Sequence, residues 1–275
     1  MARPGWRAES LKSPVDAEEL PVFVRGGGDE ALLLLHGWTL DHRAFEAQAP
    51  LADDYLLLAP DRRGFGTSRA APDLAAELDD IDAIIDALAP PSVHLLGVSQ
   101  GARLALRYAA SRPERLRSLI VQGVVVDGFD APAADDEPIP LARYADLVRQ
   151  GDLEAMRREW LAHPLMSSDP LDAAQQAAVE RMVSDYRGTD LRSPTAAAAP
   201  PPVLDALAGS RLPTLIITGK LETAGRRAHA GKLRELMPGA REIVLDRCGH
   251  LSNLSQAAAY NAALRQFLGG LAPRR

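Results

Sequence analysis

The sequence predicts an α/β fold with a mostly parallel sheet and helices on both of its faces. Short apolar segments alternate with helical stretches through most of the 275 residues. A Gly-x-Ser-x-Gly motif joins one of these apolar segments to a helical one. A long stretch with helical patterns only then separates the last two expected strands from the others. The chain is long enough to bury the core of one large α/β domain.

Seven segments have the apolar character of buried strands. Residues 31–35, for example, are five consecutive apolar residues. Continuous runs of this kind are typical of strands that a parallel sheet buries on both faces. The seven segments cover about residues 21–25, 31–35, 55–59, 93–97, 119–122, 214–218 and 241–245.

Helical patterns lie between these strands and in the long stretch without strands. Residues 74–88 have leucines and isoleucines at core spacing, and the aspartates between them are expected to form a solvated face. No strand pattern appears between Asp127 and Leu212, where helical patterns cover residues 139–150, 153–163 and 171–186. We therefore expect an all-helical insert between the core strands at residues 119–122 and 214–218. The expected boundaries are 1–127 and 205–275 for the core and 128–204 for the insert, whose Pro- and Ala-rich end at 194–202 would return the chain to the core.

The motif Gly97-Val98-Ser99-Gln100-Gly101 lies between the apolar run Val93–Leu96 and a segment of strong helix formers. A serine flanked by glycines between a strand and a helix is typical of a nucleophile elbow. Such a turn is strained and exposes the hydroxyl, and the helix N-terminus favours negative charge that develops beside it. Ser99 is therefore the candidate nucleophile. The alternative is a serine in an ordinary glycine-rich turn.

With three further motifs, the chain resembles the α/β-hydrolase superfamily. His36-Gly37-Trp38 follows residues 31–35, an Asp-x-x-Gly-x-Gly-x-Ser turn occupies residues 61–68, and Cys248-Gly249-His250 follows residues 241–245. The resemblance implies an α/β-hydrolase fold in which the helical insert is a lid. It also implies an oxyanion hole made by the backbone N–H groups of Trp38 and Gln100. It gives Asp61 a structural role only.

A serine nucleophile needs a base, and the ordinary pKa of histidine, about 6.5, suits that task. Of the six histidines, His250 has the family position and the chain order of the catalytic base. A carboxylate is also needed to orient the imidazole. Where the family usually has an aspartate after residues 214–218, this chain has Glu222. Asp127, after the expected strand at residues 119–122, is the alternative acid.

Two residues are candidates for binding substrate. Arg103 lies one helical turn after Ser99 and suits a substrate carboxylate, and the alternative is a salt bridge or a solvated position. Trp160 belongs to an apolar cluster that suits an acyl or ring pocket, and the alternative is packing of the insert against the core.

Within the superfamily, the segment Gly249–Leu254 is similar to enol-lactonases and small-ester hydrolases. Ser99 with Arg103, and Trp160 before His163-Pro164, also resemble the menaquinone-pathway lyase that eliminates pyruvate. The first hypothesis is a serine hydrolase that cleaves a small ester, thioester or lactone. The second is a lyase on the same fold that acts on a carboxylate-bearing substrate, and the third is a non-catalytic ligand-binding protein.

The composition agrees with a cytoplasmic enzyme that acts on a small molecule. The formal net charge is −6, and without a basic block we expect no nucleic-acid partner. No apolar run approaches the ~20 residues of a membrane span, and residues 1–7 have no apolar secretion signal. The sequence has one cysteine and shows no spacing of metal ligands, so we expect no cofactor and no metal. No signal predicts an oligomeric state.

Overall fold

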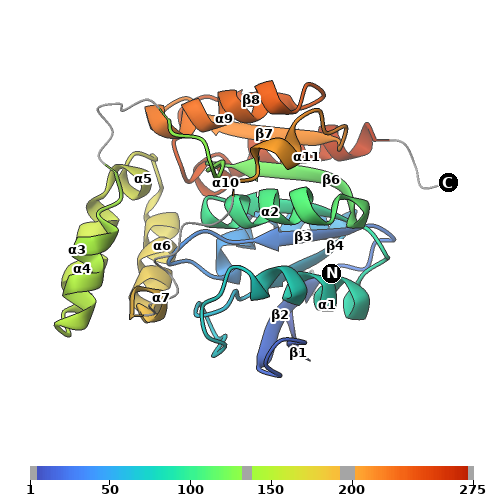
Figure 1. Ribbon diagram of the computed structural model, residues 1–275. Coiled ribbons are helices and arrows are strands. Elements are labelled where there is room, and N and C mark those ends of the chain that lie inside the picture. The colour runs from blue at the N-terminus through green and yellow to red at the C-terminus, as the bar shows by residue number, and fades with distance from the viewer. Residues whose placement is uncertain (1–4, 132–137, 193–201, 272–275) are drawn as a thin grey trace.

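An eight-stranded sheet runs through the centre of the computed structural model, which describes residues 5–131, 138–192 and 202–271 (Figure 1). The strand order is β1-β2-β4-β3-β5-β6-β7-β8. β1 and β2 form an antiparallel pair, as do β2 and β4, and every other neighbouring pair is parallel. The strands are β1 (Arg7–Lys12), β2 (Glu19–Arg25), β3 (Ala31–Leu35), β4 (Leu56–Pro60), β5 (Val93–Val98), β6 (Leu116–Gln122), β7 (Thr214–Gly219) and β8 (Arg241–Leu245).

All seven expected strands are present, and the predicted mostly parallel sheet is confirmed. The strand β1 was not predicted. This strand lies at the edge of the sheet, and its six residues are exposed or half-buried. An edge strand that buries no face has no apolar pattern for the sequence to reveal.

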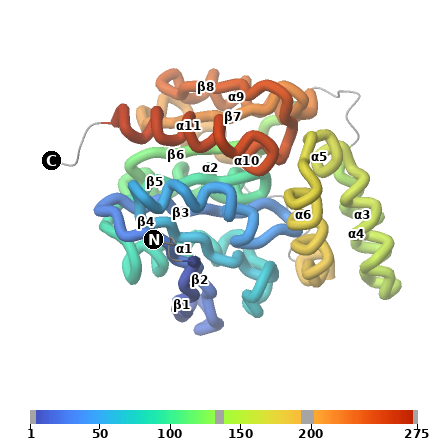
Figure 2. Tube along the Cα trace, turned by 180° about the vertical axis from the view of Figure 1, so that it is seen from behind, coloured from blue at the N-terminus to red at the C-terminus, as the bar shows by residue number. Residues whose placement is uncertain are grey.

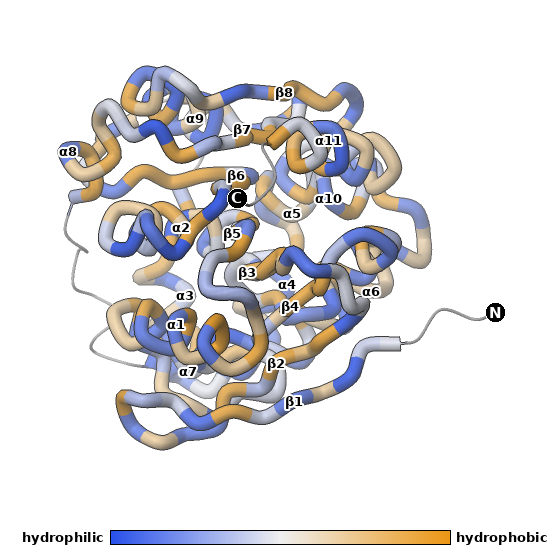
Figure 3. Tube along the Cα trace, turned by 90° about the vertical axis from the view of Figure 1, so that its right-hand side faces the viewer, coloured by the Kyte–Doolittle hydropathy of each residue, from blue (hydrophilic) through white to orange (hydrophobic). Residues whose placement is uncertain are grey.

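Helices cover both faces of the sheet because side chains of opposite parity on each strand point to opposite faces. In β3, Leu33 and Leu35 join one apolar cluster, and Leu32 and Leu34 join the other. The first cluster includes α1 (Ala76–Leu88), α2 (Gln100–Ser111) and α9 (Ala224–Leu236). The second includes the 3-10 helix η1 (His42–Asp53) and α11 (Ala257–Gly269), which Figure 2 shows in front. Figure 3 shows the hydrophobic residues gathered along the central strands.

Between β6 and β7, five of the six helices in the described residues stand at one side of the sheet (Figure 1). We call this group the insert. A third apolar cluster joins it to the core, with Trp38 and Phe65 on the core side. The expected connector at 194–202 lies outside the described residues except for Pro202. The helices of the insert are α3 (Leu141–Arg149), α4 (Leu153–Ala162), α5 (Pro164–Ser167), α6 (Ala173–Asp185) and α7 (Thr189–Arg192).

Three short elements complete the described chain: η2 (Pro113–Arg115), α8 (Leu204–Leu207) and α10 (Ser252–Ser255). Leu207 of α8 belongs to the same cluster as α2, so α8 packs on the sheet and not with the insert. Within the described ranges, no helix has the length and apolar character that a membrane crossing requires.

Candidate active site

Ser99 occupies the sharp turn between β5 and α2. Its backbone has φ 56° and ψ −116°, a conformation that a residue with a side chain rarely adopts. The glycines on either side permit this turn. A β-carbon at position 97 would lie 2.3 Å from the carbonyl oxygen of Gly101, and one at position 101 would lie 2.1 Å from that of Leu35. The motif therefore needs glycine at both positions for steric reasons.

The loop after β3 lies beside this turn. A β-carbon at Gly37 would be 3.3 Å from the Ser99 β-carbon. His36 is fully buried and ties the loop to the turn after β4, because its Nε2 accepts the N–H of Arg62 at 3.1 Å. Burial, together with the charge of Arg62, lowers the pKa of His36 to about 4. His36 is therefore neutral at pH 7, and its Nδ1–H donates to the carbonyl of Gly37 at 2.8 Å.

His250 and Glu222 form a buried pair. His250 Nδ1 lies 2.7 Å from Glu222 Oε2, and the two side chains are only 3% and 2% exposed. Burial tends to raise the pKa of Glu222. The charge and hydrogen bond of His250 and the N–H of Thr223 outweigh that effect, so the pKa lies below its ordinary value and the carboxyl is ionised. A carboxylate accepts here, so Nδ1 carries a proton.

The other ring nitrogen of His250, Nε2, is buried and has no hydrogen-bond partner among the described residues. With a proton on Nδ1, this nitrogen of the neutral ring is an acceptor. A buried acceptor without a partner is costly in a folded protein and is typical of a site that awaits a ligand or a reacting group. The nitrogen is therefore set up to take a proton.

Residues 122 and 123, at the end of β6, hold the serine and the histidine together. The Gln122 carbonyl accepts the N–H of Ser99 at 2.8 Å, and its side-chain amide donates to the His250 carbonyl at 2.7 Å. Gly123 has φ +59°, and a β-carbon there would lie 2.3 Å from His250 Cε1. The imidazole therefore lies directly on the backbone of Gly123. Neither residue was predicted as part of the site, although Gln122 ends an expected parallel strand and Gly123 follows it, at the edge where binding sites of α/β folds gather.

Asp127, the alternative acid, lies elsewhere. Its Oδ1 accepts a hydrogen bond from Arg103 Nε at 2.6 Å, and its side chain is 4% exposed. The structure thus brings Glu222, and not Asp127, to His250. It also places Arg103, one of the two candidate substrate-binding residues, in a salt bridge.

Trp160, the other candidate, lies in the interface between the insert and the core. It is 3% exposed, and its Nε1 donates to the hydroxyl of Thr39 at 2.8 Å. Its ring meets that of Trp38 edge-on, with centroids 4.8 Å apart. The Trp38 indole also contacts Tyr144 and Tyr186, and its Nε1 donates to Asp190 at 2.7 Å. Through these contacts Trp160 packs the insert against Trp38 and Thr39 of the core.

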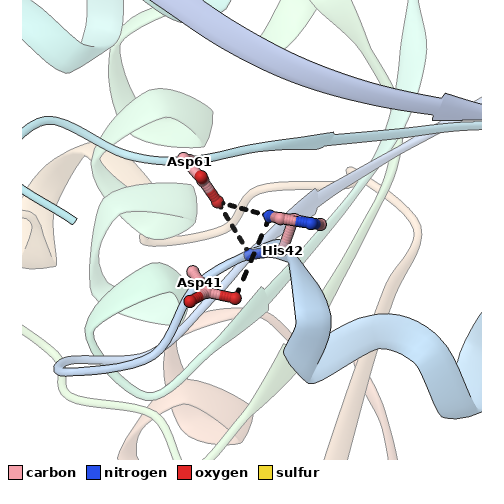
Figure 4. A group of neighbouring side chains, drawn as sticks. All are labelled: Asp41, His42 and Asp61. Carbon is pink, nitrogen blue, oxygen red and sulfur yellow. Dashed lines mark hydrogen bonds and ion pairs between the residues drawn. The ribbon is translucent and has the colours of Figure 1, made fainter. Parts of the chain in front are cut away.

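Asp41, His42 and Asp61 form the one group of acidic and histidine side chains in the described part of the chain whose spacing suits a metal ion (Figure 4). Protein donors already occupy their oxygens. Asp61 accepts hydrogen bonds from His42 Nδ1 at 2.8 Å and from the N–H of Thr67 at 2.7 Å. Asp41 binds the guanidinium of Arg43. The group therefore fastens the loops that follow β3 and β4, which agrees with the structural role expected for Asp61.

Comparison with known proteins gives a consistent result. The family model described as "Alpha/beta hydrolase family" matches residues 32–263. A pimeloyl-[acyl-carrier protein] methyl ester esterase of Aeromonas hydrophila is 28% identical over 267 residues, covering 89% of this chain and 98% of that protein. An N-formylmaleamate deformylase of Pseudomonas putida is 29% identical over 259 residues, covering 88% and 90%.

Solved structures show the same fold. An esterase from Exiguobacterium antarcticum superimposes with a TM-score of 0.81 at 22% sequence identity. The match covers 96% of this chain and 100% of the other. At that identity the likeness concerns the fold alone.

Proposed function

This chain belongs to the alpha/beta hydrolase family, and from that premise we propose that it is a serine hydrolase that cleaves a small ester, thioester or lactone through an acyl-enzyme on Ser99. It is an enzyme that acts on ester bonds, as the esterases and hydrolases among its relatives are. The observation that carries the proposal is the state of His250. One ring nitrogen is held by a buried carboxylate at 2.7 Å, and the other is buried without a partner.

In the proposed mechanism, the Ser99 hydroxyl attacks the substrate carbonyl while His250 Nε2 takes its proton. The imidazolium then returns that proton to the leaving alcohol or thiol, and an ester forms on Ser99. Water, deprotonated by the same nitrogen, attacks this ester, and the imidazolium returns the proton to Ser99 Oγ as the acid leaves. Glu222 fixes the tautomer throughout and stabilises the positive ring. General base catalysis of this kind contributes about 10²–10⁴-fold.

We propose that the backbone N–H groups of Trp38 and Gln100 hold the oxyanion. Gln100 is the first residue of α2, and the first N–H groups of a helix have no partner within that helix. Gly37 lies against the Ser99 β-carbon, which brings the loop that carries Trp38 to the nucleophile. Each such donor is worth about 3–4 kcal/mol in the transition state.

The insert is proposed to act as the lid and to set the substrate, with the core formed by residues 1–127 and 205–275. The relatives point to the class of bond. One is named for a methyl ester and another for a formyl group attached through nitrogen, and both names describe hydrolysis of an acyl bond. The lyase alternative needs Arg103 to bind a substrate carboxylate, but Asp127 already uses the Nε–H of that residue. The hydrolase therefore has the stronger support.

The test is pre-steady-state hydrolysis of short-chain p-nitrophenyl esters by the native enzyme and by Ser99→Ala. We expect a burst of p-nitrophenol in proportion to the enzyme, and no burst from the variant, whose fold is checked by circular dichroism. A variant that keeps full turnover would exclude Ser99 as the nucleophile. A folded native enzyme without turnover on any ester would favour the lyase or the binding protein.

A further inference from the structure

We propose that Asp169, a residue of the insert, is a positioning residue for the catalytic base: it holds the backbone on both sides of His250. The proposal rests on the function proposed above, because it assigns Asp169 a part in catalysis through His250. It goes further in that it gives the insert a part in catalysis besides covering the site.

The contacts of Asp169 are specific to the histidine loop. Its Oδ1 accepts the N–H of Gly249 at 2.8 Å, and its Oδ2 accepts the N–H of Leu251 at 2.7 Å. One carboxylate therefore binds the backbone N–H groups of the two residues that flank His250. A third donor, the hydroxyl of Ser255, reaches Oδ1 at 2.6 Å. A carboxylate that accepts several N–H and O–H groups forms strong, charge-assisted hydrogen bonds.

Asp169 comes from a distant part of the chain. It follows α5 in the insert, 80 positions before Gly249. A second contact of the insert lies nearby, where Gln175 Nε2 of α6 donates to the carbonyl of Leu254 in α10 at 2.8 Å. The insert thus binds the histidine loop through both side chains, and of these two hydrogen-bonding residues Asp169 is the one that reaches the neighbours of His250.

The other hydrogen bonds to the backbone of this loop, among the described residues, are made at its carbonyl groups, as by the N–H of Leu221 at Cys248 and by Gln256 Nε2 at Arg247. It runs from the end of β8 to α10 and contains Arg247 at φ +57°, an uncommon conformation for a residue with a side chain. Besides Asp169, His250 is held by Glu222 at its ring and by Gln122 at its carbonyl. Asp169 supplies the missing restraint on the N–H side. Without it, two buried N–H groups lose their acceptor, and the loop must move to find another or admit water.

A shift of the loop would change catalysis more than binding. The position of Nε2 relative to Ser99 depends on the backbone of His250, and a displacement of about 1 Å in such a group costs roughly 10²-fold in rate. The carboxylate also lines an open groove of about 1000 Å³ beside the insert, so water has a route to the broken contact. We therefore expect truncation of Asp169 to lower kcat while KM changes little.

The experiment compares Asp169→Ala and Asp169→Asn with the native enzyme on a p-nitrophenyl ester. We expect kcat to fall by roughly tenfold to a hundredfold in Asp169→Ala and by less in Asp169→Asn, which keeps one acceptor. Gln175→Ala is the matched control, because it removes a contact between the insert and the core that does not adjoin His250. Its kcat should stay within about twofold of the native value, and thermal melting of all three variants separates catalysis from stability.

Coupling to His250 distinguishes positioning from a general loss of structure. In a His250→Ala background, Asp169→Ala should lower the residual rate of labelling by a fluorophosphonate no further, because there is no imidazole left to place. An equal loss in both backgrounds would overturn the proposal. So would an unchanged kcat in folded Asp169→Ala.

A readout without turnover separates this inference from the proposed function. In proton NMR of the native protein, the Nδ1–H of His250, bound to Glu222, should give a low-field resonance that is absent in His250→Ala. We expect Asp169→Ala, or Asp169→Asn if the alanine variant does not fold, to broaden it. A native protein with no esterase activity would refute the proposed function. An unchanged resonance in the folded variant would refute the role of Asp169.

Discussion

His250 lies with its imidazole ring on the backbone of Gly123, so closely that a β-carbon at position 123 would be 2.3 Å from Cε1 and 2.6 Å from Nδ1. Gly123 follows Gln122, the residue that also binds Ser99 and the His250 carbonyl. The end of β6 and the residue after it therefore set where the ring lies relative to the serine. Position 123 needs glycine for space as well as for its φ of +59°.

Gly123→Ala should therefore damage catalysis. The methyl group displaces the ring, and we expect kcat on a p-nitrophenyl ester to fall by about 10²-fold or more. Gly231→Ala, in α9, is the control, because a β-carbon there meets nothing within 4 Å. That variant should keep its activity and gain up to about 1 kcal/mol in unfolding free energy. Native kcat in Gly123→Ala would show that the ring moves at no cost.

Glu222→Gln should lose far more rate than Asp127→Asn. The amide at position 222 no longer stabilises the imidazolium and favours the wrong tautomer, an effect of up to about 10⁴-fold in kcat for triads of this kind. Asp127→Asn weakens the pair with Arg103, and its main effect should be on stability, measured by urea unfolding. The reverse order of kcat values would assign the acid to Asp127.

Ser99→Gly should stabilise the protein while abolishing the burst. Glycine adopts the backbone angles of Ser99 without strain, and relief of such strain is worth about 1–3 kcal/mol, less about 0.5–1 kcal/mol for the entropy of glycine. We expect a net gain of about 1 kcal/mol in unfolding free energy by urea denaturation. A loss of stability would mean that contacts of the serine side chain outweigh the strain.

Acidification should destabilise the fold through His36. Its pKa in the folded chain is about 4, against an ordinary 6.5, because of burial and the charge of Arg62. Between those pKa values the unfolded chain binds a proton at His36 that the folded chain does not bind. The free energy of unfolding therefore falls as the pH drops from about 6.5 towards 4. His36→Gln should be less stable at pH 7 and should lose about 2 kcal/mol less than the native protein between pH 7 and pH 5. Parallel pH profiles of the unfolding free energy would contradict this assignment.

The sequence was enough for most of the fold because its strands are buried on both faces. Runs such as Ala31–Leu35 carry their signal in every residue, whereas β1 buries no face and carries none. The elbow at Ser99 was predictable for a related reason, since steric demands on the two glycines leave few alternatives to that motif.

The acid and the contacts that support His250 join residues that lie far apart in the sequence, and no local pattern encodes such contacts. Glu222 and Asp127 both follow strands of the parallel sheet, and only the packed loops place one of them at His250. The role of Asp169 depends on the docking of the insert, and its neighbours in the sequence resemble any polar turn. For Arg103 and Trp160 the sequence left two interpretations open, substrate binding or a structural contact. The structure shows the structural contact in each case, a salt bridge for Arg103 and packing between insert and core for Trp160.

Trp38 connects the loop beside Ser99 to the insert, the first through its backbone and the second through its indole. Its backbone follows Gly37 beside Ser99, and its indole is fixed by Asp190 and by rings from the insert. An insert taken from a relative would therefore change the contacts of that indole together with the proposed lid. To preserve rate, such a chimera must supply an acceptor for the indole N–H and an aromatic surface of matching shape. Natural divergence in specificity would face the same restriction, because residues of the proposed lid and those that support position 38 lie in one insert and must change together.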